Sequence, residues 1–278
     1  MTAINTYATL AEYKAFVTGR GQSVSTDVND DIVIDNLLEQ ASRYLDSKTS
    51  RWFYPRIEQR LYSIPDCNEL LLDADLLEVV TFLNGDDTSI ASTEYNLLPK
   101  NYSPKYAIEL TDVTSVTWES DSNSSTKFVL DLTGIFGFHD RYVDGWTIAG
   151  TLGSAMSDTT TKAITMTAGH TCAVGEVLKI DSEILIPATV VTNTVTAVAR
   201  GDNGSTAATH LNGATVYTWQ PMEEARQACL ELSMRAYKRR FGQSGGNTET
   251  ITAAGIVLVP KDVPTLVNDF INVYKRLV

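Results

Sequence analysis

Cysteine is scarce in this sequence, and its placement excludes the structures that cysteine most often builds. The 278 residues contain three cysteines, Cys67, Cys172 and Cys229. They lie far apart in the chain, are odd in number and form no C-x-x-C pair. The sequence therefore predicts neither a disulfide framework nor a structural zinc site, and we expect buried free thiols.

Histidine and the compact catalytic motifs are lacking as well. The three histidines, His139, His170 and His210, stand alone in expected loops or strand edges, without a second ligand at metal spacing. The sequence contains no G-x-S-x-G, no phosphate loop of the form G-x-x-x-x-G-K-S/T and no H-E-x-x-H. We therefore expect no metal, no cofactor and no catalytic residue, and we do not expect an enzyme.

Long apolar runs and basic residues are also few. No window of the sequence approaches a membrane span, and the N-terminus lacks the basic stretch and apolar run of a secretory signal. The 34 acidic residues outnumber the 22 basic ones, which gives a net charge of -12. We expect no membrane contact, and the negative charge disfavours broad attraction to phosphate backbones.

Two polar patterns suggest specific activities but have simpler explanations. Asp181 and Glu183 are two residues apart, so on a strand they would share a face like a pair of acid–base carboxylates. We favour a solubilising role for both at a turn or strand edge. The tripeptide Arg200–Asp202 spells a cell-adhesion signal, but the Asn-Gly that follows is typical of a turn.

A first helical region runs from Thr26 to Pro55. Asp27, Asp30 and Asp31 suit the positive end of its dipole. Apolar residues then recur at i, i+3, i+4 and i+7 for about four turns. The pattern predicts an amphipathic helix with one apolar face.

Aromatic residues close this region, in the order Trp52, Phe53 and Tyr54. They suggest either a ligand platform or burial in a core or interface, and we favour burial because aromatic side chains supply most packing area. Arg51 precedes them. Its planar guanidinium suits bidentate pairing with a carboxylate of a neighbouring segment or subunit.

A second helical region runs from Pro221 to Gly242. Glu223 and Glu224 complement the positive end of its dipole. The basic residues that complement the other end are Lys238, Arg239 and Arg240. A stripe of small residues between them permits close approach of another helix.

A final helix is expected from Val263 to Leu277. Its apolar face carries Phe270 and Tyr274, and its end carries Lys275 and Arg276. A polar, Gly-containing linker separates it from the second helical region.

The sequence between the two helical regions has the periodicity of β-strands. Residues 56–149 carry apolar runs with a period of two, and residues 150–219 carry short strands joined by Gly or Asn turns. We therefore expect an α+β fold: a helical bundle from the N- and C-terminal segments, a β-rich domain and an inserted small β-barrel or sandwich module. The expected divisions are 1–55, 56–149, 150–219 and 220–278.

Several stretches carry a family resemblance. They are Ala41–Asp46, Thr49–Pro55, Leu70–Val79, Tyr95–Asn101 and Val259–Val263. Together they resemble the head-to-tail connector, or adaptor, proteins of tailed bacteriophages. Residues 174–183 and 199–208 look like a small β module that recurs in phage structural proteins.

The resemblance implies a structural protein of the virion neck, at the portal vertex of the capsid, assembled in the host cytoplasm. Such adaptors form a ring, commonly a dodecamer, between the portal protein and a downstream neck, stopper or tail-terminator protein. Double-stranded DNA passes through the lumen without specific binding, and C-terminal sequence often docks on the portal. The implied candidates for subunit or portal interfaces are Arg51, Trp52, Phe53, Tyr54, Arg239, Arg240, Phe270, Tyr274, Lys275 and Arg276.

The charge balance and two alternatives bear on this expectation. A negative lumen would repel phosphate and let DNA slide.

The main alternative is a virion binding protein whose β module, residues 150–219, recognises a host-surface sugar or a decoration partner. That module lacks an evident aromatic platform, because Tyr217 and Trp219 lie near its end. An enzymatic alternative requires hydrolysis that depends on Asp181 or Glu183.

Overall fold

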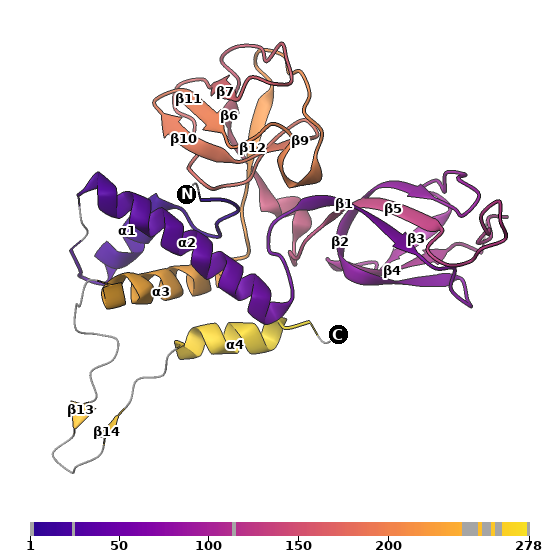
Figure 1. Cartoon of the computed structure of the whole chain (residues 1–278), viewed down its shortest axis with the longest axis horizontal. Helices are drawn as coiled ribbons and strands as arrows, with labels where there is room; N and C mark the ends of the chain where they lie inside the picture. The colour runs from indigo at the N-terminus through magenta and orange to yellow at the C-terminus, as the bar shows by residue number, and fades with distance from the viewer. Residues whose placement is uncertain are drawn as a thin grey trace. The chain divides into compact units, whose positions relative to one another are not determined.

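The chain forms two compact units, whose labelled elements appear in Figure 1. The computed structural model describes residues 3–23, 26–112, 115–240, 250–251, 257–258 and 263–276, with only the backbone given for 240, 250–251 and 257–258. The mixed unit comprises residues 1–51, 147–202 and 206–278, and the sheet unit comprises residues 52–146 with 203–205.

All four α-helices of the described residues belong to the mixed unit. They are α1 (Leu10–Gly19), α2 (Val28–Thr49), α3 (Glu223–Arg240) and α4 (Thr265–Tyr274). A capping box of Thr9 and Glu12 starts α1, and the Asp27 side chain accepts a hydrogen bond from the Asn29 amide at the start of α2. Ser50, in the left-handed conformation, ends α2.

Helices α2 and α3 come from opposite ends of the chain and pack closely. The Cys229 sulfur lies 3.5 Å from both the Ser42 hydroxyl and the Leu38 carbonyl oxygen. Ser233 donates a hydrogen bond to the carbonyl oxygen of Cys229 at 2.8 Å and is fully buried. Small side chains at these positions allow the two backbones to approach, as the stripe of small residues predicted.

The sheet unit contains one antiparallel sheet of five strands in the order β1-β5-β2-β4-β3. The strands are β1 (Arg56–Tyr62), β2 (Glu69–Leu83), β3 (Tyr95–Leu98), β4 (Lys105–Leu110) and β5 (Leu130–Phe136), followed by a short 3-10 helix, η1 (Tyr142–Gly145). Alternate residues of β5 are buried, because one face of the sheet covers an apolar core that includes Leu130, Leu132 and Phe136.

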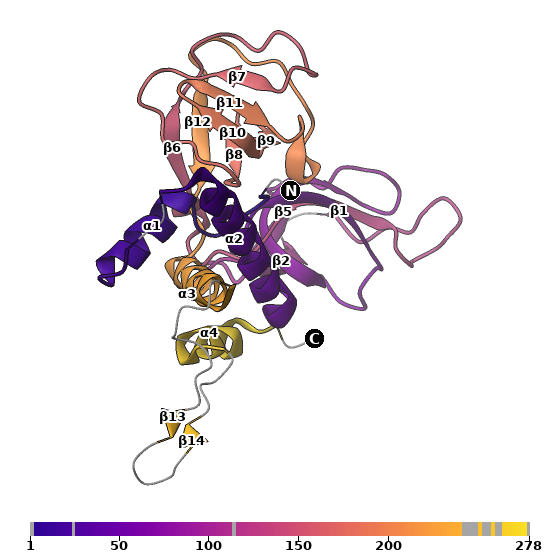
Figure 2. The ribbon, with the colours of Figure 1, turned by 60° about the vertical axis from the view of Figure 1, so that its left-hand side comes forward.

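A small β module of two antiparallel sheets completes the mixed unit (Figure 2). Its strands are β6 (Trp146–Thr151), β7 (Ala163–Thr165), β8 (Leu178–Ile180), β9 (Glu183–Leu185), β10 (Pro187–Val191), β11 (Thr194–Ala197) and β12 (Thr215–Trp219), with the 3-10 turn η2 (Asp202–Gly204). The sheet orders are β6-β12-β8-β9 and β10-β11-β7, and both sheets contribute to one apolar core. A further pair joins β13 (Thr250–Ile251) to β14 (Val257–Leu258).

The N-terminal segment holds the helices and the small β module together. The amide of Thr6 donates a hydrogen bond to the Gly175 carbonyl oxygen at 3.0 Å, and the amide of Tyr7 donates one to the Ser42 hydroxyl of α2 at 3.0 Å. Gly175 has a positive φ of 81°, and a Cβ there would lie 2.9 Å from the Thr6 hydroxyl oxygen. Only glycine therefore permits this approach without strain.

The expectation of a helical bundle is wrong. The chain is a mixed α/β protein in which strands dominate, arranged chiefly in the three larger antiparallel sheets. A bundle needs several long helices around a core of their own, whereas α1 and α4 have only 10 residues each. The N-terminal segment also packs against α2, because the Tyr7 amide donates a hydrogen bond to Ser42 and the Tyr7 side chain is buried.

Candidate functional site

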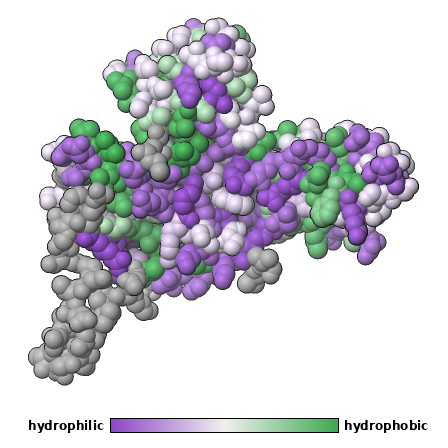
Figure 3. All heavy atoms as spheres, in the orientation of Figure 1, coloured by the Kyte–Doolittle hydropathy of each residue, from purple (hydrophilic) through white to green (hydrophobic). Residues whose placement is uncertain are grey.

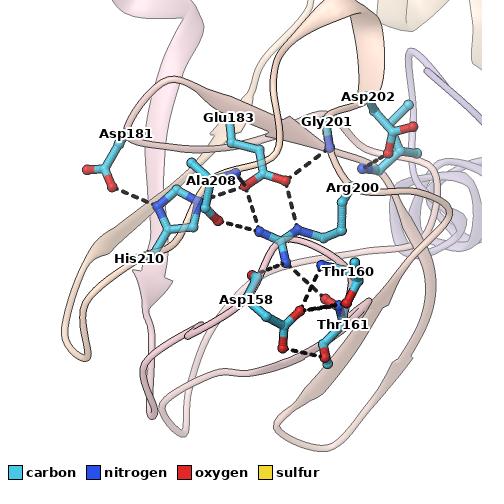
Figure 4. Close-up of polar contacts among 11 residues, drawn as sticks. Asp158, Thr160, Thr161, Asp181, Glu183, Arg200, Gly201, Asp202, Ala208 and His210 are labelled. Carbon is cyan, nitrogen blue, oxygen red and sulfur yellow. Dashed lines mark hydrogen bonds and ion pairs between the residues drawn. The ribbon is translucent and has the colours of Figure 1, made fainter.

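A buried charged cluster lies in the small β module, and Figure 4 shows its polar contacts. Its centre is Glu183, the first residue of β9, whose side chain is 0% exposed. The Arg200 guanidinium binds this carboxylate with both Nε and Nη2, at 2.8 and 2.9 Å. The amides of Gly201 and Ala208 donate to the same carboxylate at 3.0 Å each. We call these residues, with His210 and Asp181, the Glu183 cluster.

His210 lies between the two carboxylates that the sequence pattern paired. Its Nε2 is 2.8 Å from Glu183 Oε2, and its Nδ1 is 2.7 Å from Asp181 Oδ2. The His210 side chain is 1% exposed and that of Asp181 is 68% exposed. Asp181 occupies a turn with a φ of 52°, outside both β8 and β9. The two carboxylates therefore do not share a strand face.

The remaining donors of Arg200 hold a distant loop. Its Nη1 donates to the carbonyl oxygens of Asp158 and Thr161, both at 3.0 Å. Asp158 in turn accepts hydrogen bonds from the amides of Thr160 and Thr161, which fixes the loop conformation (Figure 4). Arg200 thus ties together segments of the module that lie about forty residues apart in sequence.

The electrostatics of the cluster follow from burial and hydrogen bonding. Burial by itself would raise the pKa of Glu183, but the hydrogen bonds from Arg200, Ala208 and His210 hold that pKa at about 2. The Glu183 pair raises the pKa of the Arg200 guanidinium. Glu183 is therefore an ionised structural group and not a general acid or base poised near neutrality.

This arrangement corrects one interpretation of the sequence and agrees with another. The solubilising role expected for Glu183 is wrong, because its carboxylate is buried and fully engaged by donors from other segments. The tripeptide Arg200–Asp202 is not displayed: the Arg200 side chain is 4% exposed, and Asp202 accepts a hydrogen bond from the Ile186 amide at 3.0 Å. The cluster therefore organises the loops of the module.

The cysteines and other potential ligands form no metal centre within the part of the chain that the structure describes. Cys172 and Cys229 are buried free thiols, and burial raises the pKa of Cys229 to about 11. Cys67 is exposed, so the expectation of burial is wrong for this residue, which lies in a loop before β2.

The aromatic interface candidates lie largely inside the sheet unit. Phe53 is 0% exposed and packs edge-on against Phe138 with 5.7 Å between ring centroids, and Tyr54 is also buried. The Arg56 guanidinium lies 3.7 Å above the Trp52 ring. Phe53 and Tyr54 are thus covered by other residues of the same chain. Arg51, in the mixed unit, is half-buried.

The C-terminal candidates lie at the ends of α3 and α4. Arg239 and Lys275 are exposed. Phe270 is buried and lies 4.8 Å from the Tyr274 ring, and the Arg276 amide donates a hydrogen bond to the Thr49 carbonyl oxygen at 2.8 Å. The side chain of Arg240 lies outside the described residues. These contacts anchor α4 to the other helices while leaving basic side chains at the surface.

Two grooves on the helices have opposite charge. The first, which we call the acidic groove, has a volume of about 390 Å³ between α3 and α4. Its residues are Glu223, Glu224, Gln227, Leu266, Asp269, Phe270, Val273 and Tyr274. The second, the basic groove, has a volume of about 460 Å³ between α2 and α3. Its lining includes Arg235 and Arg239 together with Ala41, Tyr44 and Leu232.

The surface of the mixed unit carries several separate apolar patches (Figure 3). Among the large exposed side chains of the helices are Val28, Ile32, Leu266 and Val273. Within the described residues, no helix is long and apolar enough to cross a bilayer. No protein-family model matches this chain, and no curated protein matches its sequence.

Proposed function

We propose that this chain is a structural head-to-tail adaptor of a tailed bacteriophage virion. In this proposal it forms a ring, a dodecamer, that joins the portal protein to a downstream neck, stopper or tail-terminator protein. The ring surrounds the DNA channel at the portal vertex of the capsid, and the DNA passes without specific binding. One observation carries the proposal: helices from both ends of the chain pack together and carry exposed apolar side chains.

The exposed apolar side chains support an assembly role. Val28 and Ile32 on α2 are 70% and 53% exposed, and Leu266 and Val273 on α4 are 50% and 74% exposed. Each pair is spaced for one helix face, at four and seven residues. Exposed apolar side chains that share a helix face are typical of protein–protein contacts, because covering them with a partner removes apolar surface from water.

The Glu183 cluster also supports a structural role, because its charges pair inside the module. Its central carboxylate, guanidinium and imidazole are directed at each other and at backbone groups of the module. The side chains of Glu183 and His210 are 0% and 1% exposed, so a substrate in solution does not reach them. A module whose buried charges pair with each other suits a structural protein, and the resemblance of residues 41–46, 49–55, 70–79 and 95–101 supports a head-to-tail adaptor.

The proposal assigns contact roles to the C-terminal candidates. Arg239 and Lys275 are exposed, and the proposal assigns them to contacts with an acidic partner such as a neighbouring subunit or the portal protein. The net charge of -12 supports a lumen that lets DNA slide, because like charges repel.

Electron cryomicroscopy of the purified chain mixed with the cognate portal assembly tests the proposal. We expect a closed ring stacked coaxially on the portal, with a continuous central channel. A chain that binds the portal as single copies, or that binds host-surface sugar while ignoring the portal, would contradict it. The second result would favour the alternative of a virion binding module.

A further inference from the structure

The acidic groove combines an apolar floor with carboxylates that the chain itself does not neutralise. Glu224 and Asp269 are exposed, and no hydrogen bond or ion pair engages either of them within the described part of the chain. Glu223 differs, because Arg226 pairs with it and Gln227 donates to it at 2.7 Å. Two negative charges therefore flank apolar surface at the first turn of α3 and the middle of α4.

Helix α4 carries exposed apolar side chains beside those that pack inside the mixed unit. Val267 and Phe270 are buried at 0% and 5% exposure. Leu266 and Val273, seven residues apart and so on one face, border the acidic groove and remain exposed. An unpaired apolar face next to unpaired carboxylates suits an occupant that is both apolar and basic.

The other end of α3 has that composition. Lys238 and Arg239 occupy its last turn, and Arg239 borders the basic groove with Arg235 above the apolar residues Ala41 and Leu232. From Glu224 to Arg239 the helix spans fifteen residues, which is about 22 Å at 1.5 Å per residue. The acidic and basic surfaces therefore lie at opposite ends of one rigid element.

We infer that a second copy of this chain occupies the acidic groove, and that it does so with the basic end of its α3. This inference rests on the proposed ring and identifies the contact that builds it. Because the two surfaces are different and lie at opposite ends of α3, the contact is heterologous: each copy offers its basic end to the next, and the repeat closes into a ring. The apolar floor supplies contact area, and the charges set the direction.

Charge reversal at each surface tests the inference. One variant combines Glu224→Arg with Asp269→Arg, so that both of its surfaces are basic. The other combines Lys238→Glu with Arg239→Glu, so that both are acidic. Native mass spectrometry and analytical ultracentrifugation of the full chain should show assembly of the unmodified protein. Each variant alone should remain monomeric, since its two surfaces repel each other.

Mixing the two variants gives the decisive measurement. In an equimolar mixture each basic surface meets an acidic one, so assembly should return, with the two chains in a 1:1 ratio and an even number of copies. A chain with all four substitutions should assemble alone. Raising the ionic strength should weaken every one of these assemblies, because salt screens exposed charges.

Matched controls separate these effects from general changes in charge. Asp66→Arg with Asp112→Arg alters net charge as the first variant does, at two exposed carboxylates of the sheet unit. Lys100→Glu with Lys127→Glu matches the second variant at exposed lysines of the same unit. Both controls should assemble like the unmodified chain. Circular dichroism establishes that every variant is folded.

Two results would overturn the inference and leave the proposed function intact. One is assembly of either reversed variant alone as readily as the unmodified chain. The other is a mixture of folded variants that stays monomeric while the unmodified chain assembles. A chain that never assembles, alone or with the portal, would instead contradict both the inference and the proposed function.

Discussion

At the scale of single residues, Arg200 links several segments of the small β module. Its guanidinium reaches Glu183 at the start of β9 and the carbonyl oxygens of Asp158 and Thr161. A buried ion pair adds little net stability by itself, because desolvation offsets the attraction, but removing one partner strands the other charge. Arg200 is therefore the single side chain whose loss harms the module most directly.

Replacing Arg200 with methionine tests this role. Arg200→Met keeps most of the side-chain volume but leaves the buried Glu183 carboxylate without its counter-charge, so we expect a loss of about 3–5 kcal/mol in the free energy of unfolding. Arg141→Met is the matched control, since the Arg141 side chain is 76% exposed and pairs with Asp144, whose side chain is 56% exposed. Urea unfolding of both variants measures the difference. A loss at Arg200 no larger than at Arg141 would contradict the role.

The raised pKa of Glu176 makes the free energy of unfolding depend on pH. Burial, reinforced by the nearby Glu12 carboxylate, raises the pKa of Glu176 to about 7 from 4.5. The folded state thus holds its proton more tightly than the unfolded state. The contribution of Glu176 is fully present below pH 4.5 and is lost as the pH rises through 7. Asp35, whose pKa burial raises to about 6, acts in the same direction.

The substitution Glu176→Gln isolates this contribution. Glutamine stays neutral at every pH. The free energy of unfolding of the variant should therefore fall by roughly 2–3 kcal/mol less than that of the unmodified chain between pH 5 and pH 8. Chemical unfolding of both proteins at the two pH values measures the change. Equal losses in the two proteins would show that Glu176 does not titrate in this range.

At the scale of secondary-structure elements, the contact between α2 and α3 depends on small side chains. Cys229 is 0% exposed and lies against Leu38 and Ser42 of α2. Cys229→Leu would push the helices apart and should cost about 1–3 kcal/mol. Cys67→Leu makes the same change at an exposed cysteine and should be nearly neutral. Thermal unfolding compares them, and a neutral Cys229→Leu would mean that the helices do not touch there.

Local signals in the sequence predicted the elements better than their arrangement. Asp27, Asp30 and Asp31 lie at the start of α2, as the pattern predicted, and Asp27 itself is the capping residue. Asn84–Asp87 forms a turn after β2, as its Asn and Gly residues favour. The helix nevertheless ends at Thr49, because Ser50 adopts the left-handed conformation. Capping and turn chemistry act over a few residues, so they can be recognised without knowledge of the fold.

The missed features all depend on residues that are distant in sequence. Glu183 meets Arg200 and His210 across 17 and 27 residues, and no periodicity connects them. The expected helical bundle failed for a similar reason: an apolar stripe shows that a helix face is buried but not what covers it. The signal in the sequence that points to the cluster is the pair Asp181 and Glu183, because ionisable residues are uncommon among short apolar strands.

At the scale of the whole molecule, the helices and the small β module belong to one compact unit. The Thr6 amide donates a hydrogen bond to the Gly175 carbonyl oxygen of the module. In the chain, strand β12 is followed directly by α3. Removing residues 150–219 would therefore take away part of the mixed unit and not an independent attachment. Point substitutions on the helices are the cleaner means of probing assembly.

The mass of the assembled protein tests the central claim most directly. Twelve copies of a 30.5 kDa chain would have a mass of about 366 kDa. Native mass spectrometry of the purified chain, alone and with the portal assembly, should detect a closed oligomer of one defined size near that value. A chain that remains at 30.5 kDa under both conditions, or forms open polymers without a limiting size, would contradict the account.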